Sequence, residues 1–153
     1  MGLFNKKTTI YSPAKGLVKS IEKVNDEMFA TKALGDGFAV EPTEELIVSP
    51  IEGTVVSVFP TKHAISLKTK QGLEVLLHIG IDTVELGGAG FTIKISEGDQ
   101  VSEETVLAEV DFSLLAAKGK ETDVMVIFTN LDKKSFVFEE GQALAGQEIG
   151  TIK

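Results

Sequence analysis

The chain has 153 residues, of which 42% are hydrophobic and 25% charged, a balance typical of one globular domain and not of a disordered chain. It has no cysteine, which excludes thiol nucleophiles, thiolate zinc sites and disulfides, and its longest apolar run, residues 124–128, is too short to span a bilayer. The net charge of −8 would repel a phosphate backbone, so we expect no nucleic-acid partner. The lack of cysteine and of a long apolar run favours a cytoplasmic protein with no stable membrane insertion.

Short β-rich runs separated by Gly, Pro, Asn and Asp predict an all-β fold, a flattened barrel or sandwich of mainly antiparallel strands. The expected strands, in chain order, are residues 16–21, 46–48, 53–58, 64–68, 74–79, 91–95, 106–110 and 124–128. Residues 111–118 show helical spacing and predict one or two turns of helix. We expect one domain over residues 1–153, with a short flexible leader of about residues 1–7.

Two short motifs recur along the chain. Residues 12–21 and 49–58 share the pattern Ser-Pro-x-x-Gly-x-Val-x-Ser-Ile/Val, in which Pro is expected to open a strand and Gly to permit the turn before it. Residues 97–101 and 140–144 share a Glu-Gly turn that precedes an apolar run. These copies predict internal pseudo-symmetry in the sandwich or barrel.

The two histidines of the chain flank a predicted β-hairpin, because two apolar runs surround a polar, glycine-containing turn between them. A loop centred between Lys70 and Gln71 places His63 opposite His78 on one face, with Cβ atoms about 5 Å apart. A register shift of one residue would separate them onto opposite faces. Adjacent imidazoles repel when both are protonated, so at least one should be neutral and able to bind a metal, shuttle a proton or act as a nucleophile. The simpler alternative is that each histidine ends a strand.

The segment from His78 to Leu86, His-Ile-Gly-Ile-Asp-Thr-Val-Glu-Leu, is preceded by Thr-Lys-His-Ala at residues 61–64 and Gly-Asp-Gly-Phe-Ala-Val at residues 35–40. In these motifs, and over essentially its whole length, the chain resembles the glucose-family IIA component of the bacterial sugar phosphotransferase system. The resemblance implies that His78 accepts a phosphoryl group on Nε2 from the phosphohistidine of the carrier protein HPr. His78 would then pass the group to a cysteine on the IIB domain of a sugar permease. Such a protein is a phosphotransferase with a phosphohistidine intermediate, and it requires no cofactor and no metal.

The resemblance also implies the parts played by neighbouring residues. His63 would donate a hydrogen bond to the phosphoryl oxygens, the Thr61 hydroxyl would hold Nδ1 of His63, and the Gly80 carbonyl would hold Nδ1–H of His78. A water-excluding, partner-binding rim would consist of apolar residues with two acidic flankers, namely Asp26, Met28, Phe29, Leu34, Phe59, Leu76, Asp82 and Val84. From their residue types alone, most of the apolar members would be expected in the core.

Three other interpretations remain open at this stage. A biotinyl or lipoyl carrier domain would need a modified lysine at a hairpin tip, for which Lys133 is the single weak candidate. A zinc-dependent hydrolase could use the His78-x-x-x-Asp82 spacing together with His63. Phosphorylation-dependent regulation of kinases or permeases through the apolar rim is compatible with the relay. Because the leader is very short and no permease segment is fused to it, we expect a diffusible protein without a membrane-binding tail.

Overall fold

Strands dominate the computed structural model, which describes residues 7–153, and they confirm the all-β fold. The strands are β1 (Thr8–Tyr11), β2 (Gly16–Ser20), β3 (Asp36–Pro42), β4 (Leu46–Val48), β5 (Gly53–Val58), β6 (Ala64–Lys68), β7 (Glu74–Ile79), β8 (Phe91–Ile93), β9 (Gln100–Val101), β10 (Val106–Val110), β11 (Val124–Phe128), β12 (Phe136–Phe138), β13 (Gly141–Ala143) and β14 (Glu148–Ile152). The helical elements are η2 (Ile21–Lys23), α1 (Glu27–Ala30), η3 (Thr83–Leu86) and α2 (Phe112–Ala117). The expected leader of residues 1–7 lies, apart from Lys7, outside the described residues.

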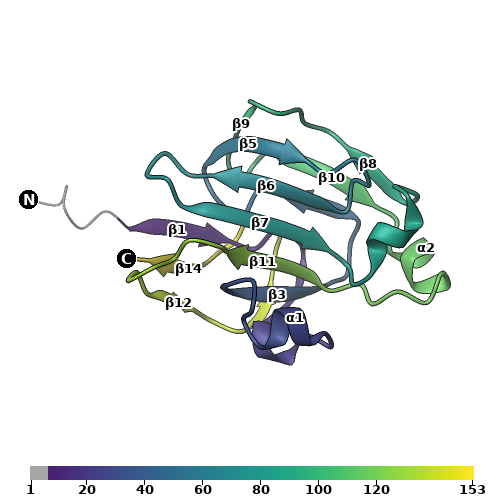
Figure 1. Cartoon of the computed structure of the whole chain (residues 1–153), viewed down its shortest axis with the longest axis horizontal. Helices are drawn as coiled ribbons and strands as arrows, with labels where there is room; N and C mark the ends of the chain where they lie inside the picture. Colours follow the sequence, from purple (N-terminus) through teal and green to yellow (C-terminus); the bar gives the residue numbers. More distant parts are fainter. Residues whose placement is uncertain (1–6) are drawn as a thin grey trace, which may run out of the picture.

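The sheet order confirms the internal pseudo-symmetry. One sheet has the order β13-β2-β3-β11-β7-β6-β5-β9, and two smaller sheets have the orders β1-β14-β12 and β4-β10-β8. Figure 1 shows the central strands of the large sheet, β3, β11, β7, β6 and β5, side by side. Exchanging β1, β2 and β3 with β4, β5 and β6, and β11 to β14 with β7 to β10, reproduces all three orders. The two halves meet where β11 pairs with β7, with Val126 opposite Leu77. The fold is therefore built from two similar seven-strand units.

The two Ser-Pro motifs hold these halves together. The N–H of Tyr11 donates to the carbonyl of Pro50 at 2.9 Å, and the N–H of Val48 donates to that of Pro13 at 2.8 Å. In each motif the serine is buried and its hydroxyl donates to the carbonyl two residues later. Strands β2 and β5, which follow the two motifs, begin at the glycine of the motif, three residues after the proline that was expected to open each strand. The prolines instead lie in the loops that exchange hydrogen bonds.

Most predicted strands have the observed bounds, and the deviations have local causes. Strands β4 to β7, β10 and β11 match, while the predicted strands at 16–21 and 91–95 end one and two residues earlier. Strand β2 stops because the Ser20 hydroxyl accepts from the N–H of Glu22 and starts η2. Helix α2 lies within the predicted segment and is capped by Asp111. The sequence missed β1, β3, β9 and β12 to β14, which are short or contain glycine, together with η2, α1 and η3.

Two apolar clusters stabilise the structure on opposite faces of the large sheet. The larger core lies between the sheets and includes the alternate residues Val75, Leu77 and Ile79 of β7. The second lies on the outer face, where Phe29 and the η2 segment cover Met125 of β11. Strand β11 is consequently buried on both faces. Within residues 7–153, no helix has the length and apolar character needed to cross a membrane.

Candidate functional site

His78 lies near the carboxyl end of β7, on the outer face of the large sheet. The residues on either side of it, Leu77 and Ile79, point into the larger core, so alternation turns the His78 ring outward, where it is half-buried. Its Nδ1 lies 2.9 Å from the carbonyl oxygen of Gly80, an acceptor, so Nδ1 carries the proton and donates. This tautomer leaves a lone pair on Nε2. The Phe29 ring packs against the imidazole at a centroid distance of 5.0 Å.

The predicted hairpin around the histidines is present, but its register differs by one residue from the prediction. Ala64, and not His63, lies opposite His78. The connecting loop spans residues 69–73 and is therefore centred on Gln71. It is closed by a 2.9 Å hydrogen bond from the N–H of Thr69 to the carbonyl of Leu73, and it contains a glycine with positive φ. A loop with an odd number of residues is centred on a residue and not between two residues, so each residue of β6 pairs one position away from its predicted partner on β7.

The two rings nevertheless meet, because His63 is not part of the extended strand. It precedes β6 and follows Lys62, whose φ of 64° turns the chain out of the strand conformation. Strand alternation therefore does not apply to its side chain. The carbonyl of His63 accepts from the N–H of Ile79 at 2.8 Å, and its ring lies 4.9 Å from that of His78 at an interplanar angle of 78°. The two imidazoles are therefore adjacent as expected, although the predicted strand register that led to this expectation is wrong.

Two neighbours other than His78 hold the ring of His63. Its Nδ1 lies 2.6 Å from the Thr61 hydroxyl, and its ring contacts that of Phe59 at 5.8 Å between centroids. When the hydroxyl donates to Nδ1, the proton of the neutral ring resides on Nε2. His63 then offers an N–H donor beside a His78 ring that offers a lone pair. The two histidines thus have different hydrogen-bonding capacities.

Burial keeps both rings neutral. It lowers the pKa of His78 from 6.5 to about 4, an effect to which the neighbouring His63 adds. The hydrogen bond to Gly80 and the carboxylates of Asp26 and Asp82 raise the same pKa and only partly offset the burial. Burial also lowers the pKa of His63. At neutral pH the site therefore presents an uncharged nucleophilic nitrogen.

The lowered pKa of His78 predicts a measurable loss of stability in acid. The unfolded chain binds a proton at a pKa of 6.5 but the folded chain at about 4, so the folding free energy becomes less favourable as the pH falls through this window. Relative to a His78→Gln variant, the unmodified chain should lose about 2 kcal/mol between pH 7 and pH 4.5. Urea unfolding of both proteins at the two pH values measures this difference. A parallel loss in both would contradict the lowered pKa.

The loop after His78 depends on a glycine that the sequence analysis identified and on a threonine that it missed. Gly80 has φ 76°, and a Cβ there would lie 2.5 Å from Cγ2 of Thr83. Thr83 is fully buried and its hydroxyl donates to the Ile79 carbonyl. The N–H of Gly80 donates to the Asp123 carbonyl at 2.8 Å. These contacts fix the carbonyl that orients His78. The sequence feature that could have identified Thr83 is its position within the His78–Leu86 motif.

The predicted rim separates into exposed and packed residues. Met28, Phe59 and Val84 are 55%, 40% and 51% exposed, so the expectation from residue type that most apolar members lie in the core is wrong for these three. The other members are the exposed Asp82, the half-buried Asp26, Leu34 and Leu76, and the buried Phe29. Asp26 caps α1 by accepting from the N–H of Met28 at 2.8 Å, and the short helix packs Phe29 on the His78 ring. Exposed apolar side chains around a polar centre are typical of a docking surface.

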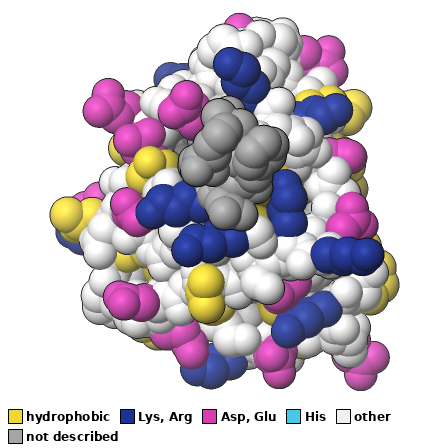
Figure 2. All heavy atoms as spheres, turned by 90° about the vertical axis from the view of Figure 1, so that its left-hand side faces the viewer, with side chains coloured by type: hydrophobic (Ala, Val, Ile, Leu, Met, Phe, Trp, Pro, Cys, Tyr) yellow, Lys and Arg dark blue, Asp and Glu magenta, His cyan; other side chains and the backbone are white. Residues whose placement is uncertain are grey.

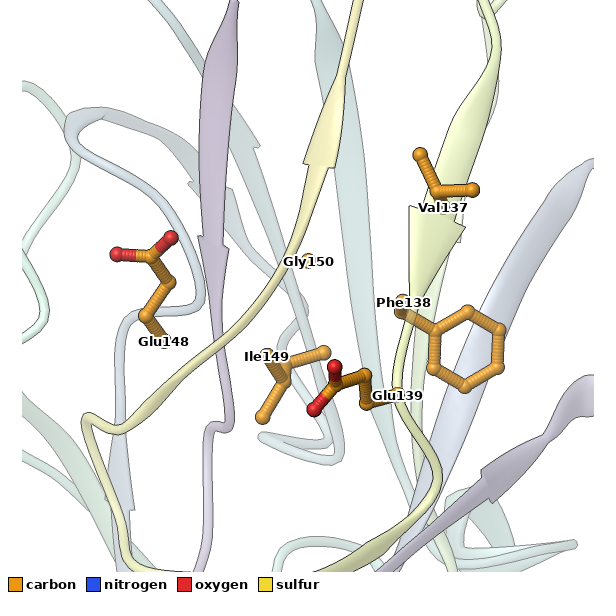
Figure 3. Close-up of a pocket in the computed structure, with 6 residues that line it drawn as sticks. All are labelled: Val137, Phe138, Glu139, Glu148, Ile149 and Gly150. Carbon is orange, nitrogen blue, oxygen red and sulfur yellow. The ribbon is translucent and has the colours of Figure 1, made fainter.

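A separate hollow of about 470 Å³ lies on β12 and β14, away from the residues predicted for the site (Figure 3). Two carboxylates, Glu139 and Glu148, and the apolar side chains of Val137 and Ile149 are among its lining residues. A negatively charged group would be repelled there. For the zinc alternative, no group of three His, Cys, Asp or Glu side chains suited to a metal ion occurs among residues 7–153.

Comparison with known proteins agrees with this geometry. Residues 8–134 match the family described as phosphoenolpyruvate-dependent sugar phosphotransferase system, EIIA 1. The chain belongs to this EIIA family. The structure of glucose permease IIA from Mycoplasma capricolum superposes with a TM-score of 0.93 at 36% identity and covers 99% of both chains. Membership favours phosphotransfer over the carrier-domain and hydrolase alternatives.

Two relatives show how this EIIA chain compares with longer proteins. It is 44% identical over 134 residues to the glucose-specific EIIA component of Halalkalibacterium halodurans, covering 88% of this chain and 77% of that one. It is 49% identical over 139 residues to the glucose-specific EIICBA component of Streptococcus pneumoniae, covering 90% of this chain. The chain spans about a fifth of the length of the pneumococcal protein, 19%.

Proposed function

We propose that this EIIA chain carries a phosphoryl group on Nε2 of His78, taking it from the phosphohistidine of HPr and passing it to a cysteine on a permease IIB domain. The observation that carries this proposal is the fixed tautomer of His78, whose Nδ1 donates to Gly80 while Nε2 keeps its lone pair beside His63. A neutral ring is a competent nucleophile without prior removal of a proton.

Each transfer conserves the phosphoryl group. The lone pair of His78 Nε2 attacks phosphorus in line, and an N–P bond forms as the N–P bond to the HPr imidazole breaks. In the second step a cysteine thiolate attacks, an S–P bond forms, and the bond to His78 breaks. His63 supports both steps because its Nε2–H, set by the Thr61 contact, can donate to an equatorial oxygen.

The rim supports the proposal in two ways. Docking of a partner on Met28, Phe59 and Val84 would cover the half-buried imidazole and exclude the water that would otherwise hydrolyse phosphohistidine. A hollow of about 340 Å³ on β5 to β7 shares Phe59 and Leu76 with the rim and extends the apolar surface along the sheet. One surface could therefore serve the donor and the acceptor in turn.

The relatives support IIB as the acceptor. The pneumococcal EIICBA component and the β-glucoside-specific EIIBCA component of Bacillus subtilis each carry the matched segment in a longer chain with B and C parts. The B. subtilis relative is 46% identical over 127 residues, which cover 83% of this chain and 21% of that protein. A IIA unit joined to a B part fits direct transfer between the two.

A direct experiment tests the class of reaction. Incubation with phosphoenolpyruvate, the general phosphotransferase enzyme and HPr should place one acid-labile phosphate on each chain, and peptide mapping should locate it on His78. Omission of HPr is the control and should leave the chain unlabelled. An acid-stable phosphate, or phosphate found only on another residue, would contradict the proposal.

The exposed rim also favours a second, regulatory function. A phosphoryl group on His78 adds negative charge at the centre of an apolar surface and changes what that surface can bind. A kinase or permease that docks on the rim would then distinguish the two states of the protein. Pull-downs with the phosphorylated and unphosphorylated chain test this, and equal recovery of every partner from both would contradict it.

A further inference from the structure

Six exposed lysines gather at one end of the molecule, which we name the lysine pole. They come from the ends of the described chain, the β6–β7 loop region and the segment after β11, and they are Lys7, Lys68, Lys70, Lys133, Lys134 and Lys153. Figure 2 faces this end and shows lysine side chains toward its centre, with acidic side chains around them. Two acidic residues, Glu74 and Asp132, lie in the same segments. The segments of the pole thus carry six lysines against two carboxylates, on a chain of net charge −8.

Hydrogen bonds hold the four segments together. The Asn130 side chain joins two of them, because its Oδ1 accepts from the N–H of Glu74 at 2.7 Å and its Nδ2 donates to the carbonyl of Gly72 at 2.9 Å. Ser135 and Lys153 exchange two backbone hydrogen bonds, at 2.9 and 3.1 Å. Strand β1, which follows Lys7 directly, pairs with β14. The lysines are therefore presented by a connected structure and not by independent loops.

The charges of the pole are available to an external partner. In the described part of the chain, the ion pairs involve lysines elsewhere, such as Lys15, Lys19 and Lys120, and none involves a lysine of the pole. A hollow of about 640 Å³ opens between the β6–β7 loop and the segment after β11, with Lys133 and Lys134 among its lining residues. This arrangement suits several anionic groups presented together on a surface.

The position of the pole separates it from the phosphoryl site. His63 and His78 lie at one end of the β6–β7 hairpin, and the pole surrounds the loop at the other end. The five-residue strand β6 places the two ends about 17 Å apart. A surface bound at the loop end of the pole would therefore leave the two histidines free for protein partners, while Lys68 alone of the six lysines lines the hollow that Phe59 and Leu76 share with the rim.

We propose that the lysine pole binds the anionic headgroups of a lipid bilayer, seating the protein on the membrane with its histidine site exposed. The partner is identified by charge complementarity and by the number of lysines that one end presents at once. Each lysine near an anionic bilayer contributes a small, salt-sensitive attraction, and several must act together to overcome the repulsion of a net negative chain. The association is peripheral and requires no inserted segment.

Vesicle sedimentation tests the proposal with the full chain. We expect binding to vesicles containing about one-third phosphatidylglycerol at low salt, and none to phosphatidylcholine alone or at high salt. The variant Lys70→Glu/Lys133→Glu/Lys134→Glu should bind at least about tenfold more weakly. The control Lys15→Glu/Lys94→Glu/Lys118→Glu makes the same change in net charge elsewhere and should keep most of the binding.

Three outcomes would overturn the proposal. These are no binding of the unmodified chain, equal loss in both triple variants, and binding that persists on phosphatidylcholine. Binding of a soluble polyanion such as heparin in preference to the vesicles, with the same dependence on Lys70, Lys133 and Lys134, would assign the pole to another class of partner and would also overturn it. A His78→Ala variant should bind vesicles like the unmodified chain, so failure of the phosphocarrier proposal and failure of this one are distinguishable.

Discussion

Replacing His78 by alanine is expected to abolish phosphorylation of the chain by phosphorylated HPr. Of the two histidines, His78 is the one whose Nδ1–H donates to a backbone carbonyl and leaves a lone pair on Nε2, and the substitution removes this nitrogen. Loss of a covalent nucleophile lowers transfer by about 10⁴-fold or more, which places the residual rate below detection. Acid-labile label per chain, measured after incubation with phosphoenolpyruvate, the general enzyme and HPr, gives the result directly.

Two further variants make this result specific. His78→Gln keeps a polar side chain of similar volume on β7 and should be equally inactive, which separates loss of the nucleophile from loss of packing against Phe29. Thr92→Ala changes an exposed residue of β8, outside the rim and the hollow beside it, and should be labelled normally. Label at full stoichiometry on a folded His78→Ala protein would show that another residue carries the phosphoryl group.

Replacing His63 by alanine is expected to leave the fold intact but to slow transfer both to and from His78 by about 10²- to 10³-fold. The ring lies 4.9 Å from that of His78, and in the proposed mechanism its Nε2–H donates to a phosphoryl oxygen in the transition state. His63→Gln retains an N–H donor and should recover part of the rate. Rapid-quench measurement of both transfers gives the rates.

The Thr61 contact provides a milder test of the same mechanism. Thr61→Val removes the hydroxyl 2.6 Å from Nδ1 of His63 without removing the ring. It should slow transfer by about tenfold, because the proton of His63 is then no longer held on Nε2.

For the His63 variants, rates unchanged in both directions for His63→Ala would reject the stabilising role. Equal rates for the alanine and glutamine variants would show that the ring acts through packing and not as a donor.

Local patterns in the sequence were sufficient for much of the large sheet. The strands that form its centre and one half are continuous runs of apolar or alternating residues, and β5, β6, β7 and β11 were predicted with their observed bounds. Five of the strands that were missed have two to five residues, and the sixth, β3, has seven residues but contains Gly37, which weakens its local strand signal. Such segments become strands because a neighbouring strand supplies their hydrogen bonds, which a local pattern does not record.

The sequence by itself determined the all-β class, the hairpin between the histidines, the repeated half and, through its motifs, the family. Tertiary structure alone decided how the two imidazole rings are brought together, at 4.9 Å between centroids. The five-residue loop places Ala64 opposite His78, and the positive φ of Lys62 turns the chain so that the His63 ring still lies beside His78. Both features depend on backbone conformation rather than on residue type. It also decided that Met28, Phe59 and Val84 are exposed and that lysines from four distant segments share one end. Exposure and charge clustering depend on which segments pack together, and those contacts form between residues far apart in the chain.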